Sequence, residues 1–244
     1  MDFDPRAHSR TALVTLGLLA ATATGGCTSH PKGGSPSPST LVSANPTSEL
    51  ASVAQRARSA SYTATYVADS SENPPRTNTI KVYRTPTRTR LDVTEATGHV
   101  LIQVDPTGTY TCNVPAAGRT TCLRLAGAGQ PVPANVDPSG QNLFTTTLDV
   151  LAQGADLTVT SAPPSPQASG LPSVTCYAVI AAAAGGAPPG TYCFTAEGVI
   201  ARAQFRSNVL RLTALGPAPV DADFTLPAAP VPLASSSPSP SPSG

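Results

Sequence analysis

The sequence predicts an α+β domain in which short antiparallel strands outnumber helices. Thr, Val, Tyr and Ile recur in short runs where apolar and polar residues alternate, and turn residues separate these runs. Two helical patterns interrupt the alternation, one before the first run and one in the middle of the chain. The stretch between the low-complexity ends, about Ser48 to Pro227 of 244 residues, is long enough to bury a single core.

Two segments have the period of an amphipathic helix. The first starts at the capping residue Ser48, and the second spans Gln141–Gln153 and stops at Gly154. Apolar residues recur three or four positions apart in both, so each helix is expected to bury one face. These apolar faces consist of Leu50, Val53, Ala54 and Ala57 in the first helix and of Leu143, Phe144, Thr147, Leu148 and Leu151 in the second.

Period-two alternation predicts two blocks of antiparallel strands. The first block lies between the two helices, and its turns fall at Thr85-Pro86, Asp105–Gly108 and Pro115–Gly118. The second block follows the second helix and a Pro/Ser loop. The expected strands are Tyr62–Ala68, Thr79–Arg84, Thr87–Val93, Val100–Val104, the hairpin Tyr110–Leu125, Leu157–Ser161, Ser173–Ile180, Gly190–Thr195, Val199–Arg206 and Val209–Leu215.

The N-terminus predicts an export signal. Arg6 and Arg10 precede an apolar run that continues to Cys27, and its apolar core is shorter than the ~20 residues of a membrane-spanning helix. The ending Gly26-Cys27 resembles the lipobox of bacterial lipoproteins, in which the cysteine is acylated and becomes the mature N-terminus. Thr24 departs from that pattern, because lipoproteins usually have an aliphatic residue there.

Two alternatives to acylation at Cys27 remain open. Cleavage after Ala21-Thr22-Ala23, an A-x-A site, would release a soluble secreted protein, and a misread start would leave a cytoplasmic one. Cysteine arithmetic favours the lipid anchor. Four of the five cysteines fall into two pairs, and acylation explains the remaining thiol. We therefore expect a protein anchored by lipid, palmitate included, to the extracytoplasmic face of the cell membrane.

The other four cysteines are interpreted as two disulfides. Cys112 and Cys122 lie at similar distances from the Pro115–Gly118 turn, and Cys176 and Cys193 are symmetric about the turn at 182–187. Cysteines directly across a hairpin reach disulfide distance, which favours Cys112–Cys122 and Cys176–Cys193, although four cysteines allow three connectivities. A metal site is disfavoured because there is no C-x-x-C spacing and no nearby histidine.

Composition divides the chain into four parts. Residues 1–27 form the signal peptide, and residues 28–47 and 229–244 are Pro/Ser-rich segments predicted to be a disordered tether and tail. Residues 48–228 form the folded domain. Charged residues make up only 12 % of the chain and the net charge is +1, so no nucleic-acid partner is indicated. We also expect a monomer.

The order helix, strand meander, helix and second antiparallel block resembles the LolA/LppX-like lipoproteins of bacterial envelopes. The stretches that carry the likeness are SVAQRARSASYTATY, TYCFTAEGVIARAQF and VDADFTLPA. The resemblance implies a half-barrel, a curved antiparallel sheet whose concave face is covered by helices. Members of this class carry acylated lipids in the cavity between sheet and helices, or act as envelope sensors.

Binding of a lipid or other apolar ligand is therefore the first functional hypothesis. Apolar walls suffice for such a ligand, at roughly 0.8 kcal/mol per buried methylene, so no polar motif is required. The alternative is that the same residues fill the core, and that the domain is an envelope sensor or interaction module. The candidate walls are Tyr66, Val82, Leu91, Val93, Val100, Ile102, Leu148, Leu151 and Phe205.

We predict no catalytic residue, cofactor or metal, although a hydrolase with a hidden site remains a third hypothesis. No G-x-S-x-G motif is present, and His99, alone in the domain, is interpreted as an exposed turn residue. Asp221 and Asp223 are interpreted as a polar strand edge rather than as paired carboxylates. The arginines around Thr85-Pro86 are interpreted as a solvated basic corner, the alternative being a contact for an anionic head group or polymer; they are Arg84, Arg88 and Arg90.

Replacing Cys27 with Ser tests the lipid anchor. The variant has no thiol to acylate, so we expect it to lose radioactive palmitate and to leave the membrane fraction. The neighbouring Thr28→Ser change keeps the cysteine and serves as the control. A Cys27→Ser protein that is still labelled and still held at the membrane would contradict the anchor.

Overall fold

The computed structural model describes residues 45–71, 75–95, 98–130, 132, 141–154, 156–164, 171–181 and 187–232, all within the unit Ser43–Gly244. The predicted signal peptide with Cys27, residues 28–44 of the predicted tether and residues 233–244 of the predicted tail lie outside this described part.

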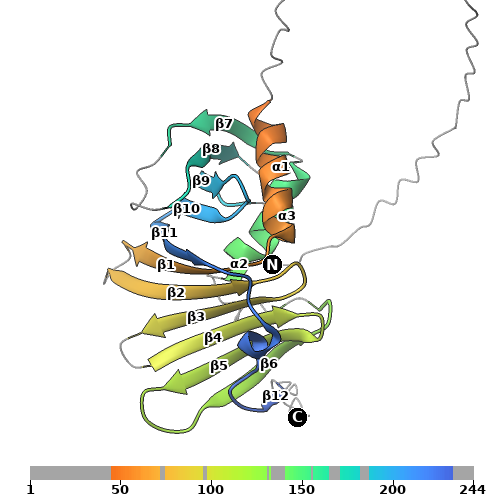
Figure 1. Cartoon of the computed structure of the whole chain (residues 1–244), viewed down its shortest axis with the longest axis vertical. Helices are drawn as coiled ribbons and strands as arrows, with labels where there is room; N and C mark the ends of the chain where they lie inside the picture. The colour runs from red at the N-terminus through yellow and green to blue at the C-terminus, as the bar shows by residue number, and fades with distance from the viewer. Residues whose placement is uncertain are drawn as a thin grey trace, which may run out of the picture. The chain divides into compact units, whose positions relative to one another are not determined.

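The described strands form one curved, open antiparallel sheet, as the sequence predicts (Figure 1). Its twelve strands run in the order β12-β6-β5-β4-β3-β2-β1-β11-β10-β9-β8-β7, and only the β12–β6 pair is parallel. The strands are β1 (Tyr62–Ser70), β2 (Arg76–Arg84), β3 (Thr89–Glu95), β4 (Gly98–Asp105), β5 (Gly108–Pro115), β6 (Thr121–Gly127), β7 (Thr158–Ala162), β8 (Val174–Ala181), β9 (Gly190–Thr195), β10 (Ile200–Phe205), β11 (Asn208–Gly216) and β12 (Pro230–Pro232).

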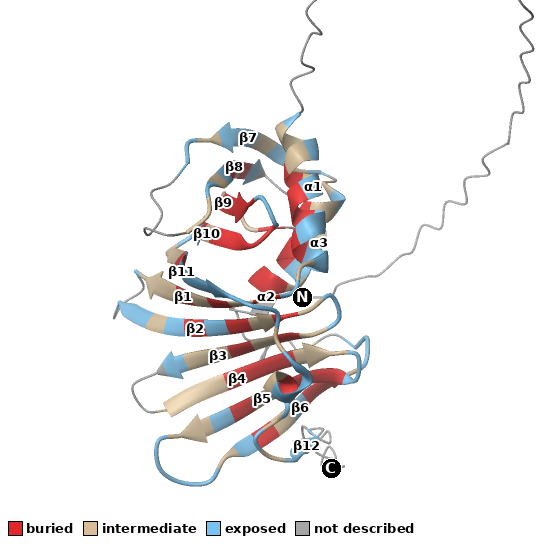
Figure 2. Ribbon diagram, in the orientation of Figure 1, coloured by how far each residue is buried: buried red, intermediate tan, exposed pale blue. Residues whose placement is uncertain are grey.

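The two faces of the sheet differ in what covers them. We call inner the face that carries Tyr62, Ala64 and Tyr66 of β1, which alternate with less buried residues along the strand. The helices pack on the inner face, and their apolar residues join those of the strands in one core cluster (Figures 1 and 2). This α+β half-barrel, a curved sheet with helices on one face, is the predicted fold class.

Helix α1 (Pro46–Ser59) begins two residues before the predicted start, inside the predicted tether. The side chain of Asn45, rather than Ser48, caps the helix by accepting a hydrogen bond from the Thr47 amide at 3.0 Å. Pro46 suits the first helical position, because its missing N–H would have no partner there. All four apolar positions that the sequence assigns to this helix are buried.

The second predicted helix is divided in two. It consists of α2 (Gln141–Phe144) and α3 (Thr146–Gln153), and Thr145 between them has φ −128° and ψ −95°, outside the helical region. The break frees the carbonyl of Phe144, which a continuous helix would pair with the amide four residues on, to accept from Arg84. The prediction of a single helix over 141–153 is therefore wrong, although the end at Gly154 is right.

The segment after β11 crosses the outer face and corrects two expectations. Asp221 and Asp223 belong to the 3₁₀ helix η1 (Asp221–Phe224), not to the edge of a strand. Leu226 and Ala228 then pack on the outer cluster of Leu101 and the first disulfide. Residues 230–232, which the sequence assigns to the disordered tail, form β12 beside β6.

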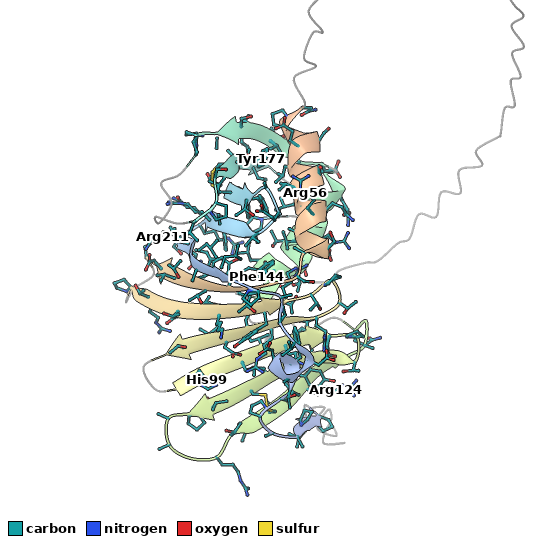
Figure 3. The ribbon with its side chains drawn as sticks, viewed as in Figure 1. Arg56, His99, Arg124, Phe144, Tyr177 and Arg211 are labelled. Atoms are coloured by element: carbon teal, nitrogen blue, oxygen red, sulfur yellow. A yellow bond between two sulfur atoms is a disulfide. The ribbon has the colours of Figure 1, made fainter. Side chains whose placement is uncertain are left out.

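Gly198, in the turn between β9 and β10, is required where that turn meets α1. Its φ is +90°, and a Cβ atom there would lie 2.5 Å from the backbone nitrogen of Ala57. The Nε of Arg56 also donates to the carbonyl of Ala196 in the same turn at 3.1 Å (Figure 3 labels Arg56). The turn thus fixes the end of α1 against the second half of the sheet.

Both predicted cysteine pairs are joined. Cys112 faces Cys122 across β5 and β6, and Cys176 faces Cys193 across β8 and β9. All four cysteines are buried, and each disulfide ties two neighbouring strands of one half of the sheet.

Removing the first disulfide should destabilise the domain. Its ends are 10 residues apart, and closing a loop of that length lowers the entropy of the unfolded chain. At 25 °C this loss corresponds to a free energy of about 3 kcal/mol. We expect the Cys112→Ala, Cys122→Ala double variant to lose about that much free energy of unfolding in a urea titration. Cys27→Ser is the matched control, and equal midpoints for both proteins would contradict the prediction.

Candidate functional site

The predicted walls come together on the inner face. All nine residues belong to the core cluster that joins the sheet to the helices, with Val93, Val100 and Phe205 partly buried at its margin. The remaining six are between 0 % and 4 % exposed; they are Tyr66, Val82, Leu91, Ile102, Leu148 and Leu151. Sequence alternation and helical period therefore identified the right face.

The walls also pack against one another. Phe144 of α2, labelled in Figure 3, contacts Tyr66 of β1 edge to face, with ring centroids 5.4 Å apart. Two surface pockets described below lie elsewhere, and none of the nine predicted walls lines either of them. In this conformation six of the nine walls are packed inside the core.

Arg84 is the charged group at the centre of this arrangement. It lies on the inner face of β2, is only 6 % exposed, and bonds to four acceptors on three neighbouring elements. The Nε donates to the carbonyl of Ala57 in α1 at 3.0 Å, and Nη1 donates to Thr89 Oγ1 at 3.0 Å and to the carbonyl of Phe144. Nη2 donates to the carbonyl of Arg58 at 3.4 Å.

The expected basic corner is therefore not a solvated cluster. Arg84 is buried, and burial lowers the pKa of its guanidinium. Arg90, on the outer face, forms a two-pronged ion pair with Asp92 at 2.8 and 2.9 Å and donates to the carbonyls of Asp223 and Thr225. The pleat of the sheet separates residues that are close in sequence. Sequence reasoning missed the role of Arg84, although Ile80, Val82 and Arg84 share one period-two face.

Two tyrosine hydroxyls lie inside the core. Tyr62 and Tyr66 are 4 % and 0 % exposed, and their hydroxyls are neighbours that interact with each other without meeting strict hydrogen-bond geometry. Neither hydroxyl has another partner among the described residues. Burial raises the pKa of both groups, and the neighbouring Tyr62 raises that of Tyr66 further. Both therefore remain protonated donors, and an unpaired buried hydroxyl costs about 1–3 kcal/mol.

A surface pocket of about 430 Å³ opens beside Arg84. We call it the Arg84 pocket. Arg58 and Asp149 form an ion pair of 2.7 Å in its wall, and both side chains are about half exposed. The other wall residues come from the end of α1, the β2–β3 turn, β4 and the α2–α3 break; they are Gln55, Ser59, Arg84, Pro86, Thr87, Arg88, Thr89, Val104, Phe144 and Thr145.

A second surface pocket of about 490 Å³ lies at the opposite end of β1 and β2. Most of its wall residues have polar side chains, among them Asp69, which pairs with Arg211 and accepts from Thr77. Figure 3 labels Arg211 on β11. No residue predicted from the sequence as a ligand contact belongs to it.

The other groups singled out in the sequence form no reactive cluster. His99 on β4 is half-buried rather than exposed, and Figure 3 places it on the half of the sheet away from the helices. Within the described ranges, no three His, Cys, Asp or Glu side chains are placed to hold a metal ion. Within the same ranges, none of the helices is long and apolar enough to cross a membrane.

Comparison with known proteins shows a partial likeness to solved structures. No family model and no curated protein matches the chain. Among solved structures, a LolA superfamily protein from Nitrosomonas europaea is similar over 72 % of this chain and 97 % of its own, with 10 % identity and a TM-score of 0.32. A likeness of this size does not place the chain in a family, and we infer function from its own residues.

Replacing Arg84 tests whether it holds the helices on the sheet. Arg84→Met leaves the buried carbonyls of Ala57 and Phe144 without their donor, so we expect the free energy of unfolding to fall by about 2–4 kcal/mol. Arg84→Lys should recover only part of this, because one ammonium cannot reach all the acceptors. The control is Arg202→Gln, because Arg202 donates an exposed hydrogen bond to Gln204 on its own strand. Urea titration measures all three, and an Arg84→Met protein as stable as the control would refute the role.

Proposed function

We propose that this chain is a non-enzymatic protein, anchored by lipid outside the cytoplasmic membrane, that binds an apolar ligand between the sheet and the helices. One observation carries the proposal: the neighbouring hydroxyls of Tyr62 and Tyr66 lie inside an otherwise apolar layer, and neither has an acceptor other than its neighbour among the described residues. A core that served only for stability would gain from phenylalanine at both positions, since each unpaired hydroxyl is destabilising. A ligand with an ester or carboxyl oxygen supplies the missing acceptor.

The apolar walls supply the rest of the binding energy. An acyl chain buried against them gains roughly 0.8 kcal/mol per methylene, so a chain of eight carbons gains about 6 kcal/mol. Six of the nine walls are buried in the present conformation, so contact between a ligand and these six requires the helices to separate from the sheet. The described polar links that oppose separation are the hydrogen bonds of Arg84 and the bond from Arg56 to Ala196.

Export is supported by the two disulfides. Such bonds persist in oxidising compartments, and here both link buried cysteines across neighbouring strands. Anchoring at Cys27 rests on the sequence alone, because that residue lies outside the described part of the chain.

A second candidate is an envelope sensor or interaction module that holds no ligand. The observation that favours it is the close packing of the nine walls, six of which are at most 4 % exposed. The two candidates differ in one measurable property, whether the purified protein contains a non-covalent apolar molecule.

Native mass spectrometry of the detergent-free Cys27→Ser chain tests ligand binding. This variant has no acylated cysteine, so extra mass reports a bound molecule rather than the anchor. We expect the Cys27→Ser chain to show an adduct with the mass of a lipid. Adding Val100→Asn, which places an amide on the inner face, should remove this adduct.

The matched control is Val67→Asn, because Val67 is a half-buried valine on the outer face of β1. It should keep the adduct. The Cys27→Ser chain is also incubated with an extract of bacterial lipids. If it still shows only its own mass, the ligand proposal is wrong and the sensor or interaction module is favoured.

A further inference from the structure

The Arg84 pocket combines a buried cation with a partly apolar wall. Arg84 is a member of the wall although it is only 6 % exposed. The apolar members of the wall are Pro86, Val104 of β4 and Phe144 of α2. At about 430 Å³ the pocket falls in the size range of small-molecule sites.

The hydrogen bonds of Arg84 leave one donor over. A guanidinium has five N–H groups, and the described acceptors use one on Nε, two on Nη1 and one on Nη2. The remaining Nη2 N–H has no acceptor among the described residues. The Nη2 bond that is made, to the carbonyl of Arg58, is also the longest of the four at 3.4 Å.

The charged residues of the pocket wall add up to a net positive charge. The wall contains three arginines, Arg58, Arg84 and Arg88, and one carboxylate, Asp149, so it carries a net charge of +2. Asp149 pairs with Arg58, and Arg88 pairs with Asp221, a fully exposed residue outside the wall. All four acceptors of Arg84 are neutral oxygens. Its buried positive charge therefore has no bonded counter-charge.

The amino end of α3 lies at the same wall. Thr145, the N-cap residue, lines the pocket. The first amides of an α-helix have no partner within it, and the helix dipole adds a partial positive charge there. The guanidinium and the helix end therefore favour the same kind of ligand.

We propose that the Arg84 pocket binds an oxyanion, a carboxylate or phosphate group, held by Arg84 and attracted by Arg58 and Arg88. The proposal goes beyond apolar binding, because the nine predicted walls are not part of this pocket. Val104 and Thr89 nevertheless lie two residues from Ile102 and Leu91 on the same inner face. The pocket thus suits the charged end of an anionic amphiphile whose chain lies along the sheet, or a free phosphate.

Calorimetric titration of the full chain carrying Cys27→Ser separates these sources. The probes are decanoate, methyl decanoate, which has the same chain without the charge, and inorganic phosphate. We expect decanoate to bind about tenfold more tightly than its methyl ester. Binding of phosphate alone would also support the oxyanion site, and would assign it to a free anion.

Asp149→Asn gives a response that a structural role would not give. It removes the one carboxylate of the wall from a half-exposed position, so we expect decanoate or phosphate to bind about three- to tenfold more tightly. Asp69→Asn is the matched control, because Asp69 also pairs with an arginine but lies at the other pocket. It should leave the affinity unchanged.

Two results would overturn the oxyanion site. One is equal binding of decanoate and methyl decanoate with no effect of Asp149→Asn, which would leave apolar binding intact. The other is the absence of binding by all three probes. Conversely, phosphate binding strengthened by Asp149→Asn, without any lipid adduct in the mass spectrum, supports the oxyanion site and rejects the apolar ligand.

Discussion

The position of the helices on this sheet depends on one buried guanidinium. Arg84 reaches from β2 to the last turn of α1, to β3 and to the end of α2. Burying a cation costs several kcal/mol, and here neutral oxygens rather than a carboxylate offset that cost. The offset is complete only while all these elements keep their places, since each contributes a separate acceptor. Arg84 therefore couples elements that are 26 to 60 residues apart in the chain.

The β2–β3 hairpin also binds the C-terminal segment on the outer face of the sheet. Arg88 lies over the ring of Phe224 at 4.2 Å and pairs with Asp221. Arg90 donates to the carbonyls of Asp223 and Thr225. Three arginines within seven residues thus act on opposite faces, because side chains alternate along a strand. Polar contacts therefore tie the β2–β3 hairpin to the helices on the inner face and to the C-terminal segment on the outer face.

The periodicity of the sequence predicted the features of the fold that depend on local sequence pattern. The alternation of Tyr62, Ala64 and Tyr66 predicted an inner face. The symmetric spacing of the cysteines about their turns favoured the two pairs. The break at Thr145, η1 and β12 were not predictable in this way, since each is decided by a distant partner: Arg84, the hairpin arginines and the edge of β6. The Arg84 pocket depends on the same long-range contacts, so only the identity of its arginines was visible in the sequence.

The size of the inner residues limits how the interior can take up a ligand. Where α1 approaches the sheet, the core contains Ala54 and Ala57 on the helix and Ala64, Ala201 and Ala203 on the strands. Side chains this small have no alternative rotamers, so rearranging them cannot create space for an acyl chain. A ligand must instead move α2 and α3, whose larger residues Phe144, Leu148 and Leu151 fill the interior. Because Arg84 holds the end of α2, the charge in the pocket and the volume of the interior are coupled, and an oxyanion that competes for Arg84 would weaken the bond that keeps the interior closed.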